Sequence, residues 1–381
     1  MSWTLTDLCA LAAPEVTMTD PDRLPETVSP RTTMVGGGIY DENARHQRTA
    51  VNLAMPLLCR AIETVPLPAD GAPFVLADYG SATGFNTFAP ARKVVSEVRR
   101  RGGTSIPICV VHNDQADNDY AALFRGVATS AESYAHEKGV FVLAAGTSFY
   151  RPVLPARFVS LGWSANAVHW LSDPPCRVPD RLSFRRPADG IDTPFGQRAH
   201  EDWTRFLRAR AIELRPGGAL VVAMVEADDS GSSGADHFLD VLTEVLAAQV
   251  ESNALRAREV ARMIVPLYFR TEREIRLPWQ SAEIADALAL VEYEHAILDD
   301  PLWAAFERTG DRSTFAHHHV AWLRGYSENV LFTGLDADRT APQARKIADA
   351  AYNEVRERVE RSPDRANCSW KLALLRIARP S

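Results

Sequence analysis

Small and polar residues follow the apolar segments of this 381-residue chain at the points where buried strands would end. The stretch ADYGSATGFNT, residues 77–87, places Asp78, Gly80 and Gly84 after one such segment, and Asp114 ends the next. In an open α/β sheet, ligands bind outside the carboxyl ends of the strands. Glycines let the backbone approach a bound molecule closely, and an acidic residue at a second strand end accepts hydrogen bonds from a ribose diol. The pattern therefore predicts a nucleoside-binding site.

The glycine spacing separates this site from two common nucleotide-binding motifs. Gly80 and Gly84 form G-x-x-x-G, and Asp114 lies 34 residues beyond Gly80. A dinucleotide fingerprint instead has G-x-G-x-x-G and an acidic residue about 20 residues further on. No P-loop, G-x-x-x-x-G-K-S/T, occurs in the sequence. The spacing favours an adenosyl ligand without a pyrophosphate, and the alternative is that the glycines only form a strand-to-helix turn.

The elements that position these residues are short apolar segments separated by amphipathic stretches. The predicted strands are FVLADYG, PICVVHND, GVFVLAAG, RFVSLGWS and GALVVAMVE. Residues 87–102, 119–138 and 200–214 have helical spacing, and Pro216-Gly217-Gly218 is expected to end the last of these helices. Strands that alternate with helices in this way predict an α/β fold with a mostly parallel sheet.

A second region begins after the polar linker ADDSGSSGAD, which follows Glu226. Residues 237–326 have a mainly helical pattern, and we expect them to cap the strand ends. A charged helix over residues 341–361 and an apolar strand over residues 369–380 are expected to return the chain to the sheet.

Composition and charge argue against several classes of partner. The chain has 42 basic and 49 acidic side chains and a net charge of −7, so neither nucleic acid nor a membrane surface is expected as a partner. Five scattered cysteines without a Cys-x-x-Cys motif predict neither a disulfide framework nor a cysteine metal site. No uncharged apolar run reaches the ~20 residues of a membrane span, and the N-terminus lacks the basic residues of a signal peptide. These features predict a cytoplasmic protein.

Five stretches resemble, in order and spacing, the motifs of the SABATH methyltransferases: MVGGGIYDENARHQ, ADYGSATGFNT, NDQADNDYAALF, GTSFYRPVLP and SANAVHWLSDPP. Members of that family transfer a methyl group from S-adenosylmethionine to small carboxylic acids and, in some cases, to purine nitrogens. The resemblance is dense over residues 34–175 and implies a class I methyltransferase fold, which is a Rossmann-like α/β fold, with a helical cap. It also implies S-adenosylmethionine as methyl donor, S-adenosylhomocysteine as product, and a homodimer.

The patterns along the chain, taken with the resemblance, predict four parts. We expect residues 1–50 to form a lid segment, residues 51–226 a cofactor-binding core, residues 227–330 a mainly helical substrate cap, and residues 331–381 a returning helix and strand.

The resemblance also assigns residues to a site. The implied cofactor contacts are Tyr40, Asp78, Gly80, Ser81, Asn86, Asp114, Gln115, Ser148 and Phe149. The implied substrate contacts are Gln47, Asn166, His169 and Trp170. In this arrangement Asn86 reaches the methionine end of the cofactor, Asp114 takes the ribose hydroxyls, and Phe149 packs on the adenine.

Gln47 and Trp170 are the residues expected to position the reacting group. Their amide and indole N–H groups are neutral donors, which hold a carboxylate without neutralising it and so leave it nucleophilic. A carboxylic acid with a pKa of about 4 to 5 is already ionised at neutral pH, so the reaction requires no general base. His169 is then either a hydrogen-bonded wall residue or a direct substrate contact.

Two departures from the family limit what can be carried over. Asn166 stands where many members carry a Tyr, which makes this wall smaller and more polar. Ala261-Arg262-Met263-Ile264 replaces a magnesium-binding stretch of some members, so no metal is expected. The run His317-His318-His319 does not change this, because consecutive helical side chains point about 100° apart.

The predicted function is O-methylation of a small or fatty carboxylic acid by in-line methyl transfer. One alternative is N-methylation of a heterocycle, which requires the proton of the ring nitrogen to be removed or absent. The other is a regulator that binds S-adenosylmethionine without turnover, against which the presence of both Gln47 and Trp170 counts.

Overall fold

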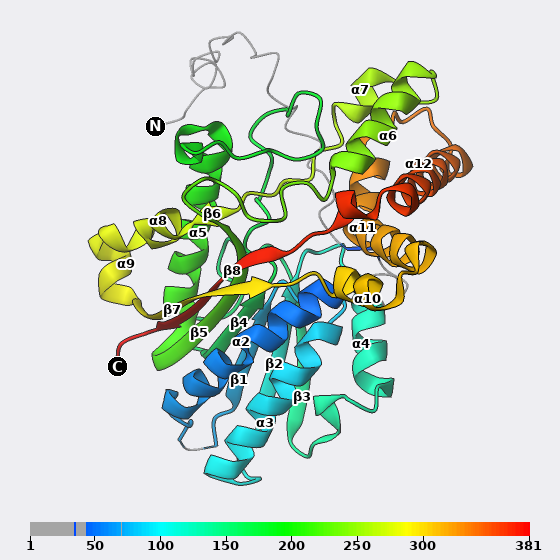
Figure 1. The fold of residues 1–381 in the computed structure, drawn as a ribbon. Helices are drawn as coiled ribbons and strands as arrows, with labels where there is room; N and C mark the ends of the chain where they lie inside the picture. The colour runs from blue at the N-terminus through cyan, green and yellow to red at the C-terminus, as the bar shows by residue number, and fades with distance from the viewer. Residues whose placement is uncertain (1–33, 36–42, 70) are drawn as a thin grey trace, which may run out of the picture.

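The computed structural model describes residues 34–35, 43–69 and 71–381. These residues form an eight-stranded sheet in the order β3-β2-β1-β4-β5-β8-β7, with the short strand β6 paired to β5 (Figure 1). The strands are β1 Phe74–Tyr79, β2 Ile108–Asp114, β3 Val140–Gly146, β4 Val159–Ala165, β5 Leu214–Ala227, β6 Arg270–Thr271, β7 Ala289–Leu298 and β8 Trp370–Ala378. Neighbouring strands are parallel except that β8 is antiparallel to both β5 and β7. The sheet is thus mostly parallel, as the sequence predicts.

Helices cover both faces of the sheet. They are α2 Arg45–Thr64, α3 Phe88–Gly102, α4 Tyr120–Thr129, α5 Pro194–Glu213, α6 Asp240–Glu251, α7 Ala257–Val260, α8 Glu272–Arg276, α9 Ala282–Ala287, α10 Pro301–Thr309, α11 Arg312–Gly334 and α12 Ala341–Arg361. In Figure 1, α2 and α3 lie on one face, and α6, α7, α11 and α12 gather beyond one end of the sheet. None of the helices in the described part of the chain combines the length and apolar composition that crossing a membrane requires.

Alternate side chains of the central strands enter two hydrophobic cores, one on each face. Along β5, Val221 and Val225 join the core that includes α2 and α3. Leu220 and Met224 join the core that includes the aromatic side chains of α5. Because successive side chains of a strand point to opposite faces, one apolar segment supplies both cores. The strand ends are held between these two layers.

Strand β7 lies inside the segment 237–326 that the sequence pattern assigns to a helical cap. It pairs with β8 from Ala289 opposite Ala378 to Leu298 opposite Trp370, and so belongs to the sheet. Most of its side chains are exposed or half-buried, so it lacks the regular apolar alternation that marks a strand in sequence. The mainly helical pattern expected for residues 237–326 is wrong at residues 289–298, which form this strand.

One predicted helix boundary also differs from the structure. The helix expected over residues 119–138 ends at Thr129, because the backbone of Ser130 is extended. The helix expected over residues 200–214 ends at Glu213, within one residue of its predicted end, and the Pro-Gly-Gly run that follows lies inside β5. There the register with β4 shifts at a bulge, and Gly217 adopts a φ of +74° that favours glycine.

A buried ion pair anchors α5 to the back of β1. Arg210 Nη2 lies 3.0 Å from Glu213 Oε1, and both side chains are fully buried. The Tyr79 hydroxyl donates to Glu213 Oε2 at 2.6 Å, and the Arg210 guanidinium lies 3.9 Å from the centre of the Tyr79 ring. Tyr79 directly precedes Gly80, so this cluster supports the strand end that carries the predicted site.

Replacing Arg210 by Met is expected to lower the free energy of unfolding by about 3 to 5 kcal/mol, because Glu213 would remain as an unpaired buried carboxylate. Urea denaturation measures the change. The matched control is Arg208→Met on the same helix, since Arg208 pairs with Glu283 at the surface. Such surface pairs contribute about 1 kcal/mol or less, so equal losses in the two variants would contradict this role for Arg210.

Candidate active site

A cavity of about 970 Å³, partly open to solvent, lies at the carboxyl ends of four strands. Its walls include Gly80 after β1, Asp114 at the end of β2, Ala165 at the end of β4 and Val225 near the end of β5. The strand-end residues that the sequence predicts to meet therefore lie around one space. We call this space the main cavity.

A smaller cavity of about 370 Å³ shares several wall residues with the main cavity, among them Gly80. Ser81 and Asn86 line it, and the Ser81 Oγ and Asn86 Oδ1 atoms are buried without a hydrogen-bond partner among the described residues. Asp78 also lines it, and its carboxylate accepts a hydrogen bond from the Thr87 hydroxyl across the turn. Buried polar atoms normally have partners. Unpaired oxygens here fit the ammonium group at the methionine end of S-adenosylmethionine.

Gly80 brings the turn after β1 against the loop after β4. Its φ is +87°, and a Cβ atom at this position would lie 2.2 Å from the Ala167 Cβ. Only glycine tolerates both the left-handed backbone and this close approach. The two loops that border both cavities are therefore in contact at Gly80.

Asp114 is held by backbone hydrogen bonds at the end of β2. Its Oδ2 accepts from the Ala82 N–H at 2.7 Å and its Oδ1 from the Gln115 N–H at 2.8 Å. Burial raises the pKa of Asp114 to about 6, since it outweighs these two hydrogen bonds, and the nearby charges of Asp78 and Asp117 add to the increase. Each carboxylate oxygen retains a lone pair, so Asp114 can also accept the hydroxyls of a ribose diol.

The remaining predicted cofactor residues have different outcomes. Gln115 and Phe149 line the main cavity, and the Phe149 ring packs edge-on against Phe206 at 5.8 Å between ring centres. Ser148 is not among the wall residues of either cavity, and its hydroxyl accepts a hydrogen bond from the Tyr150 N–H at 3.3 Å. Tyr40 lies outside the described residues.

Gln47 and Asn166 line both cavities, at the junction between them. Gln47 lies in the first turn of α2, and Asn166 follows β4 with a φ of +58°, which Asn tolerates better than most residues. Asn166 Nδ2 donates to the Gln47 carbonyl oxygen at 3.3 Å. The Gln47 Oε1 and Asn166 Oδ1 atoms are buried and have no partner in the described part of the chain. These two amides therefore border the space where the groups in the two cavities would meet.

His169 is a neutral wall residue of the main cavity. Its Nδ1 accepts a hydrogen bond from the Val225 N–H at 3.4 Å, which leaves the proton on Nε2. Burial and, to a smaller extent, the positive charge of Arg270 lower the pKa of His169 to about 3. The imidazole is thus an N–H donor at neutral pH and too weak a base to remove a proton.

Trp170 lies in a loop that a distant segment holds in place. Its backbone forms an antiparallel bridge with Leu267, and the Tyr268 N–H donates to the His169 carbonyl oxygen at 3.0 Å. The Tyr150 hydroxyl donates to the Trp170 carbonyl oxygen. The indole then borders the main cavity, where it meets Tyr326 edge-on at 6.5 Å between ring centres.

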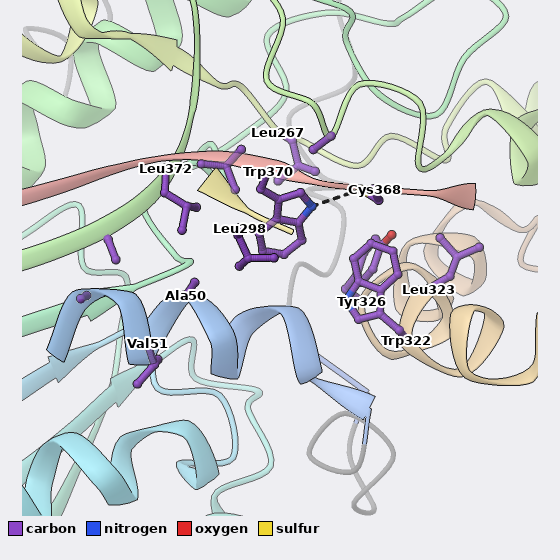
Figure 2. Close-up of a cluster of buried hydrophobic side chains, with 14 of the residues drawn as sticks. Ala50, Val51, Leu267, Leu298, Trp322, Leu323, Tyr326, Cys368, Trp370 and Leu372 are labelled. Carbon is purple, nitrogen blue, oxygen red and sulfur yellow. Dashed lines mark hydrogen bonds between the residues drawn. The ribbon is translucent and has the colours of Figure 1, made fainter. Parts of the chain in front are cut away.

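Several wall residues of the main cavity are not predicted from the sequence. They are aromatic and come from distant segments: Phe238, Phe269, Trp322, Tyr326 and Trp370. Figure 2 shows Trp322 and Tyr326 side by side on α11, and Trp370 on β8 near the start of α2. The four-residue spacing of Trp322 and Tyr326 marks one face of a helix, but such a pair is indistinguishable from core residues in sequence.

The described residues hold no group of three or more His, Cys, Asp or Glu side chains arranged to bind a metal ion. The donor set of the two cavities instead fits an adenosyl cofactor. The two cavities offer the carboxylate of Asp114, the aromatic ring of Phe149 and the unpaired oxygens of Ser81 and Asn86, which are groups that suit a ribose diol, an adenine ring and an ammonium group.

Comparisons with a family model and with known proteins indicate the same family for this chain. Residues 31–283 match the family model described as SAM dependent carboxyl methyltransferase. Methyltransferase LUC1 from a Fusarium species is 30% identical over 250 residues, which are 64% of this chain and 65% of that protein. Gibberellic acid methyltransferase 2 from Arabidopsis thaliana is 25% identical over 259 residues, which are 62% of this chain and 67% of that protein. The first of these matches thus spans a little less than two thirds of the relative.

A solved structure supports the fold. The structure of loganic acid methyltransferase with SAH superposes with a TM-score of 0.73, over 91% of this chain and 99% of the other, at 20% sequence identity. The fold is therefore that of the class I methyltransferases, as the resemblance implies.

Binding of S-adenosylhomocysteine is expected to weaken as the pH falls below about 6, by at most about tenfold per pH unit, because a protonated Asp114 loses acceptor capacity for the ribose diol. Above about pH 7 the affinity is expected to be constant. Isothermal titration calorimetry between about pH 5 and 8 measures the dissociation constant. Asp114→Asn should bind more weakly and lose this pH dependence. A wild-type affinity that does not change over the range would contradict the assignment.

Proposed function

Because this chain belongs to the family of S-adenosylmethionine-dependent carboxyl methyltransferases, we propose that it methylates the carboxylate of a small or fatty carboxylic acid. The observation that carries the proposal is the wall of the main cavity. Gln47 and Trp170 both line it, and none of its described wall residues is Lys or Arg. Such a wall binds an anion through neutral donors.

Neutral donors suit a carboxylate that must act as a nucleophile. A guanidinium would form charge-assisted hydrogen bonds and hold the negative charge on the oxygens. The amide of Gln47 and the indole of Trp170 instead orient the carboxylate and leave its charge available. When bound, S-adenosylmethionine supplies the electrophilic methyl group and a positive charge next to the acceptor.

Catalysis then rests on placement, with no residue acting as a general base. The acceptor is already ionised at neutral pH, and His169, with its pKa lowered to about 3, stays neutral and can only donate a hydrogen bond. Holding the reacting groups in line can lower the barrier by about 7 to 11 kcal/mol. The aromatic side chains in the wall of the main cavity would limit the number of water molecules around the reacting groups.

The weakness of His169 as a base also bears on the alternatives. Methylation of a protonated ring nitrogen would need a base. Among the described wall residues of the two cavities, the carboxylates are Asp114, which is assigned to the ribose, and Asp78, which accepts a hydrogen bond from the Thr87 hydroxyl. A regulator without turnover would need neither Gln47 nor Trp170 at the cavity wall. O-methylation uses both residues and requires nothing further.

The test is an assay of methyl ester formation from methyl-labelled S-adenosylmethionine with benzoic, indole-acetic, terpenoid and fatty acids. We expect label in the ester of at least one acid class. Gln47→Ala and Trp170→Phe should each lower kcat/KM for the acid at least about tenfold, since one donor is lost, and leave the cofactor dissociation constant nearly unchanged. Label on a heterocycle alone would sink the proposal, as would unchanged turnover in both variants.

We also propose that the protein is a homodimer in the cytoplasm. Cys59, Cys109 and Cys368 are free thiols, as is usual in a reducing compartment. On strand β3, at one edge of the sheet, Phe141 and Leu143 are 55% and 45% exposed. Exposed apolar side chains on an edge strand favour a protein interface.

Sedimentation equilibrium of the wild type should give twice the chain mass of 42.0 kDa. Phe141→Asp should shift the protein toward monomer, because a charge would be buried in the interface. The control is Val291→Asp on β7, which is similarly exposed at the opposite edge of the sheet. A monomeric wild type, or equal dissociation of both variants, would contradict this interface.

A further inference from the structure

We infer that the carboxylic acid substrate carries, apart from its carboxylate, an oxygen that can accept a hydrogen bond, as a hydroxyl, carbonyl or ether. We infer also that Trp322 and Tyr326 select substrates with this oxygen. The inference rests on the proposed function and narrows its substrate class. Both residues lie on α11, four positions apart, and are only 3% and 4% exposed. Their ring centres are 5.2 Å apart, and both rings line the main cavity.

The polar atoms of these two side chains lack partners. Neither Trp322 Nε1 nor Tyr326 Oη has a hydrogen-bond partner among the described residues, although both atoms are buried. Other indoles are satisfied, since Trp203 donates to the Ile275 carbonyl oxygen at 2.9 Å and Trp370 to Cys368 Sγ at 3.1 Å (Figure 2).

Buried tyrosine hydroxyls elsewhere are satisfied as well. The Tyr268 hydroxyl donates to Glu274 at 2.8 Å, and the Tyr352 hydroxyl shares a hydrogen bond with Ser327 at 2.8 Å. Leaving a buried donor unpaired costs the desolvation of that group, so each such donor requires an explanation. Two unpaired donors at the wall of one cavity are explained by an occupant that accepts from them.

The surrounding wall does not supply that acceptor. Next to Trp322 and Tyr326, the wall consists of apolar side chains such as Phe238, whose ring centre lies 5.5 Å from that of Tyr326. A substrate that is purely hydrocarbon apart from its carboxylate would leave both donors unpaired. A substrate with an oxygen at this position would accept a hydrogen bond from at least one of them.

The Trp322 ring is held in place by neighbouring side chains, so it can discriminate between substrates with and without the oxygen. The His46 ring stacks on it with 4.4 Å between centres, and His46 Nε2 lies 3.0 Å from Asp300 Oδ1. Asp300 in turn accepts from the Leu302 N–H at 2.8 Å at the start of α10. Because the ring is fixed, Trp322 Nε1 cannot move to reach a different acceptor atom. A substrate that lacks the oxygen therefore leaves this donor unpaired.

The oxygen is expected to lie close to the carboxylate end of the acceptor. Tyr326 contacts Trp170 edge-on at 6.5 Å between ring centres, and Trp170 is a proposed carboxylate donor. The Tyr326 ring thus lies next to the indole that is proposed to bind the carboxylate. This geometry favours a compact oxygenated acid over an unsubstituted long-chain acid.

The test compares acids that differ by one oxygen near the carboxylate: benzoic with hydroxybenzoic and methoxybenzoic acid, naphthoic with hydroxynaphthoic acid, and cyclohexanecarboxylic with oxocyclohexanecarboxylic acid. Methyl ester formation gives kcat/KM for each. At least one oxygenated acid should be preferred by about tenfold or more, and Tyr326→Phe or Trp322→Phe should reduce that preference severalfold. Tyr352→Phe, a buried change of the same kind outside the cavity, should keep it.

The outcomes distinguish this inference from the function on which it rests. Esters formed with no preference for oxygen in any pair would overturn the inference and leave the proposed function intact. A preference that survives in both variants would also overturn it. If no acid is esterified while S-adenosylhomocysteine binds, the proposed function fails and the inference fails with it.

Discussion

The buried guanidinium of Arg270 holds the loop on which the acceptor side of the site depends. Arg270 is 1% exposed and donates to the carbonyl oxygens of Val168 at 2.7 Å and Ala199 at 2.6 Å. The far end of the same loop is held by Asp202, which accepts from both the N–H and the hydroxyl of Ser172 at 2.8 Å. A buried charge is tolerated only when its hydrogen bonds are satisfied, so these contacts restrict the loop strongly. His169 and Trp170 lie between the two anchors.

Arg270 also contributes to a difference in charge between the acceptor side and the cofactor side of the site. The charge of Arg270, together with burial, keeps His169 neutral, so the acceptor side presents neutral donors. The cofactor side presents Asp114 and the unpaired oxygens of Ser81 and Asn86, which suit a cation. Under the proposed function, an anionic acceptor and a cationic methyl donor would each meet groups of suitable character. The charge of the cofactor would then favour a carboxylate held beside Gln47 and Asn166.

Much of the cofactor side could be predicted from the sequence, because its residues are set by short-range order along the chain. Gly80 and Ser81 directly follow strand β1 in the sequence, and Asp114 is the last residue of β2. The parallel sheet brings these strand ends together. Strand β7 could not be predicted, because it is defined by pairing with β8, far along the chain, and not by its own apolar pattern. The aromatic wall was likewise hidden, since a buried Trp on a helix gives the same signal whether it lines a core or a cavity.

The site residues that could be predicted from the sequence and those that could not lie in different parts of the chain. Gln47, His169 and Trp170 lie within residues 31–283, which match the family, and we propose that they serve the methyl transfer. Trp322, Tyr326 and Trp370 lie beyond that range, on α11 and β8. His46 stacks on both Trp322 and Trp370 and directly precedes Gln47 in α2, so it links the two sets through direct packing. Under the proposed function, a change in the C-terminal wall would alter which acid is accepted while the carboxylate still contacts Gln47.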